Sequence, residues 1–301
     1  MDRNDETPLH EDGDRPGWSL PGSIHRRRAL AWLAGAGTFA LLTACGSDGD
    51  GLVTVPPTPS PTPSPTPTPV PPPTPTPPGP EPICAPTPAE TSGPYPADGT
   101  NTSSGSTSNV LVTSGIQRSD IRPSFIDTTT VAAGVQLTLT ITVLDGDACT
   151  ALGGRAVYIW QADAHGLFSL YTIPQESYLR GLGLTNGEGK VTFTTIVPGC
   201  LADRFPHIYV EVFPDLFSSN RGSNADLTTQ LIVPAEICQA AYADSATYPG
   251  STTNLAGVSI ASDPVFGDDS TQDNNARTLS VAGSVSAGFT SEVSITLPAG
   301  T

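Results

Sequence analysis

Residues 207–212, HIYVEV, alternate apolar and polar side chains, which is the pattern of a β-strand with two unlike faces. The apolar face carries Ile208, Val210 and Val212, and the polar face carries His207, Tyr209 and Glu211. The pattern predicts a half-buried strand whose polar face holds two side chains able to bind a metal. An active metal site, the remnant of one and the solvated side of a sheet are all compatible with this face.

Similar period-2 patterns recur at other positions of the chain. Further strands are expected at residues 135–143, 155–163, 190–197 and 293–297. Asn186-Gly187 precedes the third of these and signals a tight turn. Helical patterning is almost confined to residues 234–244, with Pro234 near the first helical position. The sequence therefore predicts an all-β protein, a Greek-key β-sandwich with long connecting loops.

The first 44 residues have the organisation of an export signal. Arg26-Arg27-Arg28 precedes an apolar stretch, residues 29–44, that is too short to span a bilayer stably. The arginines suggest twin-arginine export, and Sec export is the alternative. Residues 42–45, LTAC, resemble a bacterial lipobox, which predicts a lipid anchor on Cys45. An ordinary signal peptide with a chance cysteine is the competing interpretation.

A proline-rich stretch separates this signal from the rest of the chain. Of the 32 prolines, 16 fall between Pro56 and Pro82, alternating mostly with threonine and serine. Such a tract favours extended polyproline II and predicts a stalk. The expected organisation is a signal peptide at 1–44, a stalk at 45–82 and one β-domain at 83–301.

The net charge limits the expected binding partners, and the cysteines indicate the redox compartment. Without the first 44 residues, which hold 6 acidic and 5 basic side chains, the chain keeps 23 acidic and 8 basic ones, a net charge of −15. Nucleic acid and anionic membrane surfaces are therefore excluded as expected partners. The domain has four widely spaced cysteines, which predict two disulfides in an oxidising compartment and leave three pairings open: Cys84, Cys149, Cys200 and Cys238.

Several segments match, in order, those of a known enzyme family. They are ETSGPYPADG (90–99), QRSDI (117–121), GGRAVYIWQADAHG (153–166), YLRG (178–181), VTFTTIVPG (191–199), RFPHI (204–208), QLIVPAEIC (230–238) and SDPVF (262–266). In these segments the chain resembles the intradiol ring-cleavage dioxygenases, in particular their secreted, disulfide-containing branch. The resemblance implies a β-sandwich with one ferric iron, Fe(III), that inserts O2 into catechol-type aromatic rings. It also implies a catechol-type small molecule as ligand and a homodimer.

The family binds its iron through two tyrosines and two histidines, and three of these positions differ here. Phe168 stands where the first tyrosine is expected, after Trp160, and Leu201 stands where the second is expected. His207 matches one histidine, and Tyr209 replaces the other. The metal-binding candidates are therefore His207 and Tyr209.

Other residues carry expectations from the same resemblance. Arg204 matches a family arginine that acts on the substrate oxyanion, and a structural ion pair is the alternative role. Tyr171 and His165 are the candidates to rebuild a rearranged iron site. The resemblance also implies two disulfides, Cys200–Cys238 and Cys84–Cys149.

Two functions remain open from the sequence. One is an exported, lipid-anchored dioxygenase of the bacterial cell envelope with a rearranged iron site, acting in aromatic compound catabolism. The other is a non-catalytic binding or structural domain on the same scaffold. The retained YLRG and VTFTT segments and the cysteines, which serve folding, favour the second function.

Overall fold

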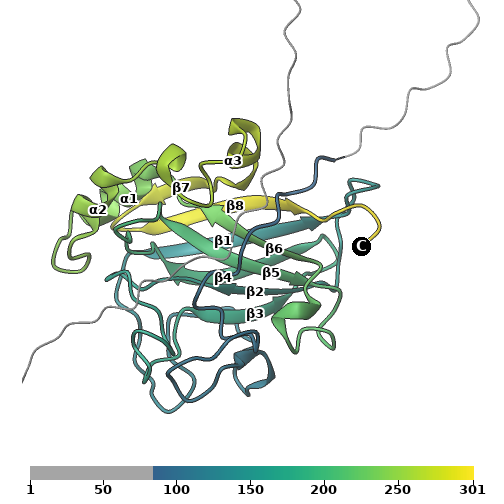
Figure 1. The fold of residues 1–301 in the computed structure, drawn as a ribbon, viewed down its shortest axis with the longest axis horizontal. Helices are drawn as coiled ribbons and strands as arrows, with labels where there is room; N and C mark the ends of the chain where they lie inside the picture. The colour runs from purple at the N-terminus through teal and green to yellow at the C-terminus, as the bar shows by residue number, and fades with distance from the viewer. Residues whose placement is uncertain (1–83) are drawn as a thin grey trace, which may run out of the picture. The chain divides into compact units, whose positions relative to one another are not determined.

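The structure is a computed structural model that describes residues 84–301 (Figure 1). The predicted signal peptide, Cys45 and the stalk lie outside these residues. The strands are β1 (Gln136–Leu144), β2 (Ala156–Trp160), β3 (Arg180–Leu184), β4 (Lys190–Ile196), β5 (His207–Phe213), β6 (Leu227–Ile232), β7 (Ser280–Ser284) and β8 (Gly288–Thr296). The helices are α1 (Ala235–Tyr242), α2 (Ser251–Gly257) and α3 (Thr271–Arg277), with short 3-10 turns η1 (Val110–Val112), η2 (Gly222–Asn224) and η3 (Ile260–Ser262).

The strands form two four-stranded sheets, in the orders β4-β1-β8-β7 and β3-β2-β5-β6. All pairings are antiparallel except that of β1 with β8. The strand patterning explains the layers, because each sheet turns its apolar side chains inward. Leu137, Leu139 and Ile141 of β1 are fully buried in one core with Ile208 and Val210 of β5. The predicted all-β sandwich is confirmed.

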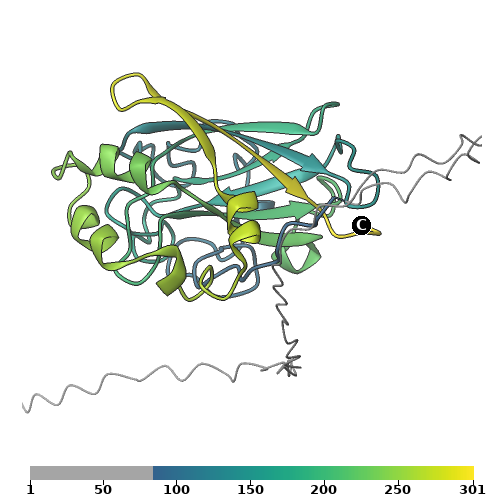
Figure 2. The ribbon, with the colours of Figure 1, turned by 90° about the horizontal axis from the view of Figure 1, so that it is seen from above.

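Helices contribute more than the sequence predicts. Helix α1 matches the predicted segment, with Pro234 as the N-cap just before its first residue. The short helices α2 and α3 were not predicted, because STTNLAG and TQDNNAR carry no apolar stripe. All three lie outside the sheets, with α3 against β6 and β8 (Figures 1 and 2). No helix within residues 84–301 is long and apolar enough to cross a bilayer.

Strand β5 differs from its prediction in burial. All seven of its residues are buried, so the expected half-buried strand is wrong in this respect. The reason is non-local, because the start of the domain crosses the outer face of β3-β2-β5-β6 and covers it. In Figure 1 this start is the dark blue part of the ribbon, and its hydrogen bonds with β6 and β3 fix it there.

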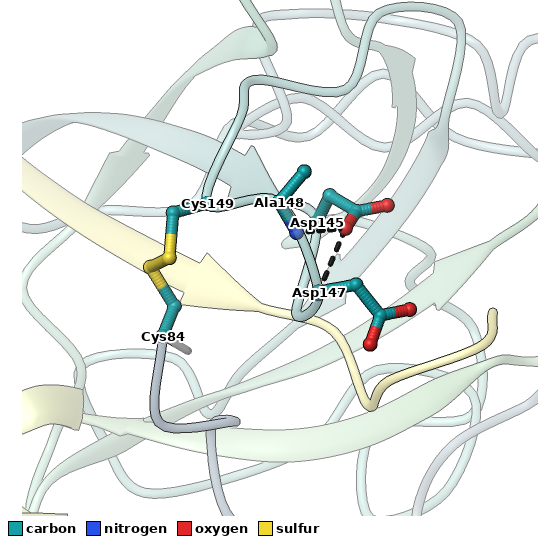
Figure 3. Close-up of a disulfide and its surroundings, with 5 residues drawn as sticks. All are labelled: Cys84, Asp145, Asp147, Ala148 and Cys149. Carbon is teal, nitrogen blue, oxygen red and sulfur yellow. Dashed lines mark hydrogen bonds between the residues drawn. A yellow bond between two sulfur atoms is a disulfide. The ribbon is translucent and has the colours of Figure 1, made fainter. Parts of the chain in front are cut away.

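One of the two implied disulfides is present. Cys84 is bonded to Cys149, with their Cα atoms 5.4 Å apart, and Figure 3 shows the bond beside a tight turn. In that turn Asp145 Oδ1 accepts hydrogen bonds from the backbone N–H groups of Asp147 and Ala148 at 2.8 and 2.7 Å. These bonds fix the backbone just before Cys149.

The second implied disulfide, Cys200–Cys238, is absent, which corrects that expectation. Both residues are buried thiols. Each sulfur lies against backbone carbonyls of its own segment, Cys200 Sγ at 3.4 Å from Leu201 O and Cys238 Sγ at 3.9 Å from Val233 O. Burial raises the pKa of both thiols to about 12, which keeps them protonated.

Candidate functional site

The polar face of β5 is enclosed by a cover segment, residues 90–98. Gln230 Nε2 donates to Thr91 O at 2.8 Å, and two Arg180 nitrogens donate to the carbonyls of Tyr95 and Pro96 at 2.9 Å. Gly93, with φ +65°, lies directly over Tyr209, where a Cβ atom would stand 2.7 Å from the phenol oxygen. The close approach requires glycine, and it shuts Tyr209 off from solvent.

Beneath the cover segment, aromatic rings fill the region where the resemblance places iron. Trp160 is stacked between Tyr158 and Tyr209, with ring centroids 5.0 and 4.9 Å away. The ring of Phe168 meets Tyr209 edge-on at 6.2 Å and contacts Tyr95 at 4.7 Å. The register explains the stack, because Trp160 of β2 stands directly opposite Tyr209 of β5.

His207 is held as a neutral imidazole. Its Nδ1 lies 2.6 Å from Phe205 O, which can only accept, so Nδ1 carries the proton. Burial, reinforced by the charge of Arg204, lowers the pKa of His207 to about 3. Its Nε2 is buried and has no hydrogen-bond partner. The imidazole therefore keeps one unpartnered nitrogen lone pair in a buried place, with its ring edge-on to Tyr209 at 4.7 Å.

Arg204 is committed to a buried ion pair. Its Nε donates to both carboxylate oxygens of Asp263 at 3.0 and 3.2 Å, and its Nη2 donates to Gln230 Oε1 at 2.6 Å. A third nitrogen, Nη1, lies 3.4 Å from the phenol oxygen of Tyr209. Asp263 also accepts backbone N–H bonds from Phe205 and from Val265. These contacts match the structural role considered for Arg204.

The side chains present do not fit a ferric ion. Phe168 is buried and Leu201 packs against the same aromatic cluster, and neither has a donor atom. Burial raises the pKa of Tyr209, partly offset by Arg204, which disfavours the phenolate that iron requires. Within residues 84–301 no group of three or more His, Cys, Asp and Glu side chains could hold a metal. His207 and Tyr209, whose rings lie 4.7 Å apart, are two donors where the resemblance implies four ligands.

Of the two candidates for a rearranged site, Tyr171 packs at the edge of the aromatic cluster, with its ring 5.2 Å from that of Tyr95. The Tyr171 hydroxyl donates to Asn101 Oδ1 at 2.6 Å and accepts from the backbone N–H of Ala97 at 2.9 Å, so its oxygen is occupied. His165 is exposed and lines a separate pocket of about 230 Å³ with Asp163.

Sequence reasoning missed a pair of buried carboxyl groups at the far end of β5. Asp98 and Glu211 are at most 1% exposed, and one oxygen of each, Oδ2 and Oε2, has no hydrogen-bond partner. Both press on Gly222, where a Cβ would stand 1.7 Å from Asp98 Oδ2. Burial, and secondarily the neighbouring Asp98, raises the pKa of Glu211 well above its ordinary value. Only the place of Glu211 on the polar face of its strand hinted at this pair.

Comparisons with known proteins identify solved structures that share this fold. No model of a known protein family matches the sequence, and no curated protein matches it either. Among solved structures, an intradiol ring-cleavage dioxygenase from Tetranychus urticae superposes with a TM-score of 0.54 at 22% identity, over 72% of this chain and 97% of that one. A second dioxygenase crystal structure gives a TM-score of 0.53 at 21% identity, over 72% and 96%. Residues 84–301 therefore have the fold of the intradiol ring-cleavage dioxygenases.

Proposed function

We propose that this protein is an exported, lipid-anchored protein of the cell envelope. Its dioxygenase-fold domain serves as a binding or structural domain and does not cleave aromatic rings. The observation that carries this proposal is the composition of the inherited iron site. Of its four ligand positions, only His207 keeps the expected donor. Phe168 and Leu201 cannot bind a metal, and Tyr209 is stacked on Trp160 beneath the cover segment.

The surroundings of these positions support the same conclusion. Fe(III) needs several hard or imidazole donors in one geometry, and groups around it cannot replace missing ligands. Arg204, which the resemblance matches to a catalytic arginine, is paired with Asp263, whose side chain is fully buried. Residues at this site that stabilise the fold and do not catalyse a reaction account for both the missing iron ligands and the Arg204–Asp263 pair.

Export and anchoring are supported by the sequence. Arg26-Arg27-Arg28, the apolar residues 29–44 and Cys45 follow one another in the order of a lipoprotein signal, and the proline-rich stalk follows directly. The Cys84–Cys149 disulfide is consistent with an oxidising compartment outside the cytoplasm.

Metal content tests the first part of the proposal. The purified full-length chain is incubated with ferric iron and desalted, and bound iron and the visible tyrosinate-to-iron absorption are measured. We expect neither above background. The matched control carries Phe168→Tyr, Leu201→Tyr and Tyr209→His, which restores the four-ligand set, and it should gain both signals if side chains alone are missing. Stoichiometric, coloured iron in the unmodified chain would refute the proposal and favour a rearranged enzyme.

Lipidation is tested separately in bacterial cells expressing the chain. Labelled palmitate should be incorporated into the unmodified protein and not into Cys45→Ser, and only the former should fractionate with membranes. Equal labelling of the two proteins would exclude Cys45 as the anchor.

A further inference from the structure

Arg277 is a fully buried arginine shared by two carboxylates. It is the last residue of α3. Its Nη1 contacts Glu90, and its Nη2 contacts Asp269 and Asn274 Oδ1. Its side chain is 0% exposed, and those of Glu90 and Asp269 are 13% and 20% exposed. Its remaining nitrogen, Nε, is buried without a partner.

Glu90 is the first residue of the cover segment, so this contact fastens the cover to the body of the domain. The backbone N–H of Glu90 donates to Thr228 O of β6 at 2.7 Å. Three residues later, Gly93 lies on Tyr209. The side chain of Glu90 therefore ties the cover segment to α3, while its backbone ties the same residue to the sheet.

The charges in this contact do not balance when both acids are ionised. One guanidinium carries one positive charge, and two carboxylates carry two negative charges in a partly dehydrated place. Like charges sharing a site oppose each other's ionisation, so one proton is retained more easily here than in the unfolded chain. Burial, and the nearby Asp269, raise the pKa of Glu90 to about 7 despite the opposing effect of Arg277.

We propose that Glu90, Asp269 and Arg277 form a pH-sensitive clasp that holds the cover segment closed in acid and loosens it as the pH rises toward neutrality. When Glu90 keeps its proton, the clasp is neutral and its hydrogen bond to Arg277 remains. When Glu90 loses the proton, the clasp carries one net negative charge. Opening the cover segment then lets water reach Glu90, and with it Tyr209 and the stacked Trp160.

The direction follows from proton linkage. A carboxyl group whose pKa is higher in the closed state than in the open one stabilises the closed state at low pH, and this contribution is lost as the pH rises through the higher value. Between the two pKa values the closed state weakens about tenfold per pH unit for one proton, and above the higher value it weakens no further. The charged groups that face Glu90 are Arg277 from α3 and Asp269 from the loop before it, while β6 presents only backbone at Thr228.

Hydrogen exchange measured by mass spectrometry tests the clasp in the full-length chain. The readout is the protection factor of peptides covering the cover segment, with peptides from β5 as internal reference, between pH 4.5 and pH 8.5. In the unmodified protein, protection of the cover segment should fall by up to about tenfold per pH unit between about pH 5 and neutrality and then level off, while that of β5 stays constant.

Two isosteric variants and one control make the test specific. Glu90→Gln cannot ionise, and Asp269→Asn leaves one carboxylate on one guanidinium, so both should keep the cover segment protected up to pH 8.5. His165→Gln removes an exposed histidine that lines a separate pocket, and should behave like the unmodified protein. A pH-independent cover in the unmodified protein would overturn the proposal, as would an undiminished fall in both clasp variants.

Discussion

Replacing Arg204 by methionine separates a folding role for this residue from a catalytic one. Methionine keeps much of the apolar stem and removes the guanidinium. It leaves the carboxylate of Asp263, which is 0% exposed, without its positive partner. Breaking a buried pair in this way costs about 3–5 kcal/mol. Asp263 retains backbone N–H donors, including those of Phe205 and Val265, so we expect the lower end, about 3 kcal/mol.

That loss is a large fraction of the 5–15 kcal/mol typical of a folded domain. Urea unfolding followed by far-ultraviolet circular dichroism measures it. The control is the double variant Arg204→Met, Asp263→Asn, which removes both charges and should recover part of the loss. If Arg204→Met costs less than about 1 kcal/mol, the guanidinium is not needed for folding. The structural interpretation of Arg204 would then be refuted, and retention for a ligand would be the better explanation.

Two further predictions concern the disulfide and a hydrogen-bonded carboxylate. Replacing both Cys84 and Cys149 by serine opens a cross-link with a sequence separation of 65, and should cost about 4 kcal/mol in urea unfolding; a loss below about 1 kcal/mol would contradict it. Burial alone would raise the pKa of Glu176, but hydroxyl donors including Ser124 and Thr128, at 2.6 and 2.7 Å, outweigh it and lower that pKa. The ionised Glu176 carboxylate therefore stabilises the fold above its unfolded pKa, and this stabilisation is lost as the pH falls. Glu176→Gln should flatten the loss of stability between pH 5 and about pH 3. An unchanged dependence of stability on pH in this acidic range would argue against this role.

The strands were predictable because their pattern is local. The alternation in residues 207–212 identified β5 and assigned each side chain to its correct face. It did not predict that both faces are buried, because the covering residues lie more than a hundred positions earlier in the chain. Helix α3 escaped prediction for another reason. Its side chains are mostly polar, and what holds it is a local cap at Ser270 and the buried Arg277.

The candidate site was predictable only in part. The resemblance placed Phe168, Leu201, His207 and Tyr209 at one location, and the structure places these residues in and around one aromatic cluster. The partners that decide the chemistry were not predictable. Asp263 belongs to a recognised segment, yet nothing in that segment indicates that its carboxylate faces an arginine 59 positions earlier.

The disulfide at the entrance of the domain has a mechanical consequence. A pull on the chain ahead of Cys84 passes through the covalent bond to Cys149, just beyond β1, a strand paired on both sides. Tension therefore bypasses the cover segment and loads β1 along its length, a direction in which many ladder bonds resist together. Reduction of that bond would instead direct the force into residues 84–98, which would peel from β6 one contact at a time and uncover the aromatic cluster before the sandwich yields.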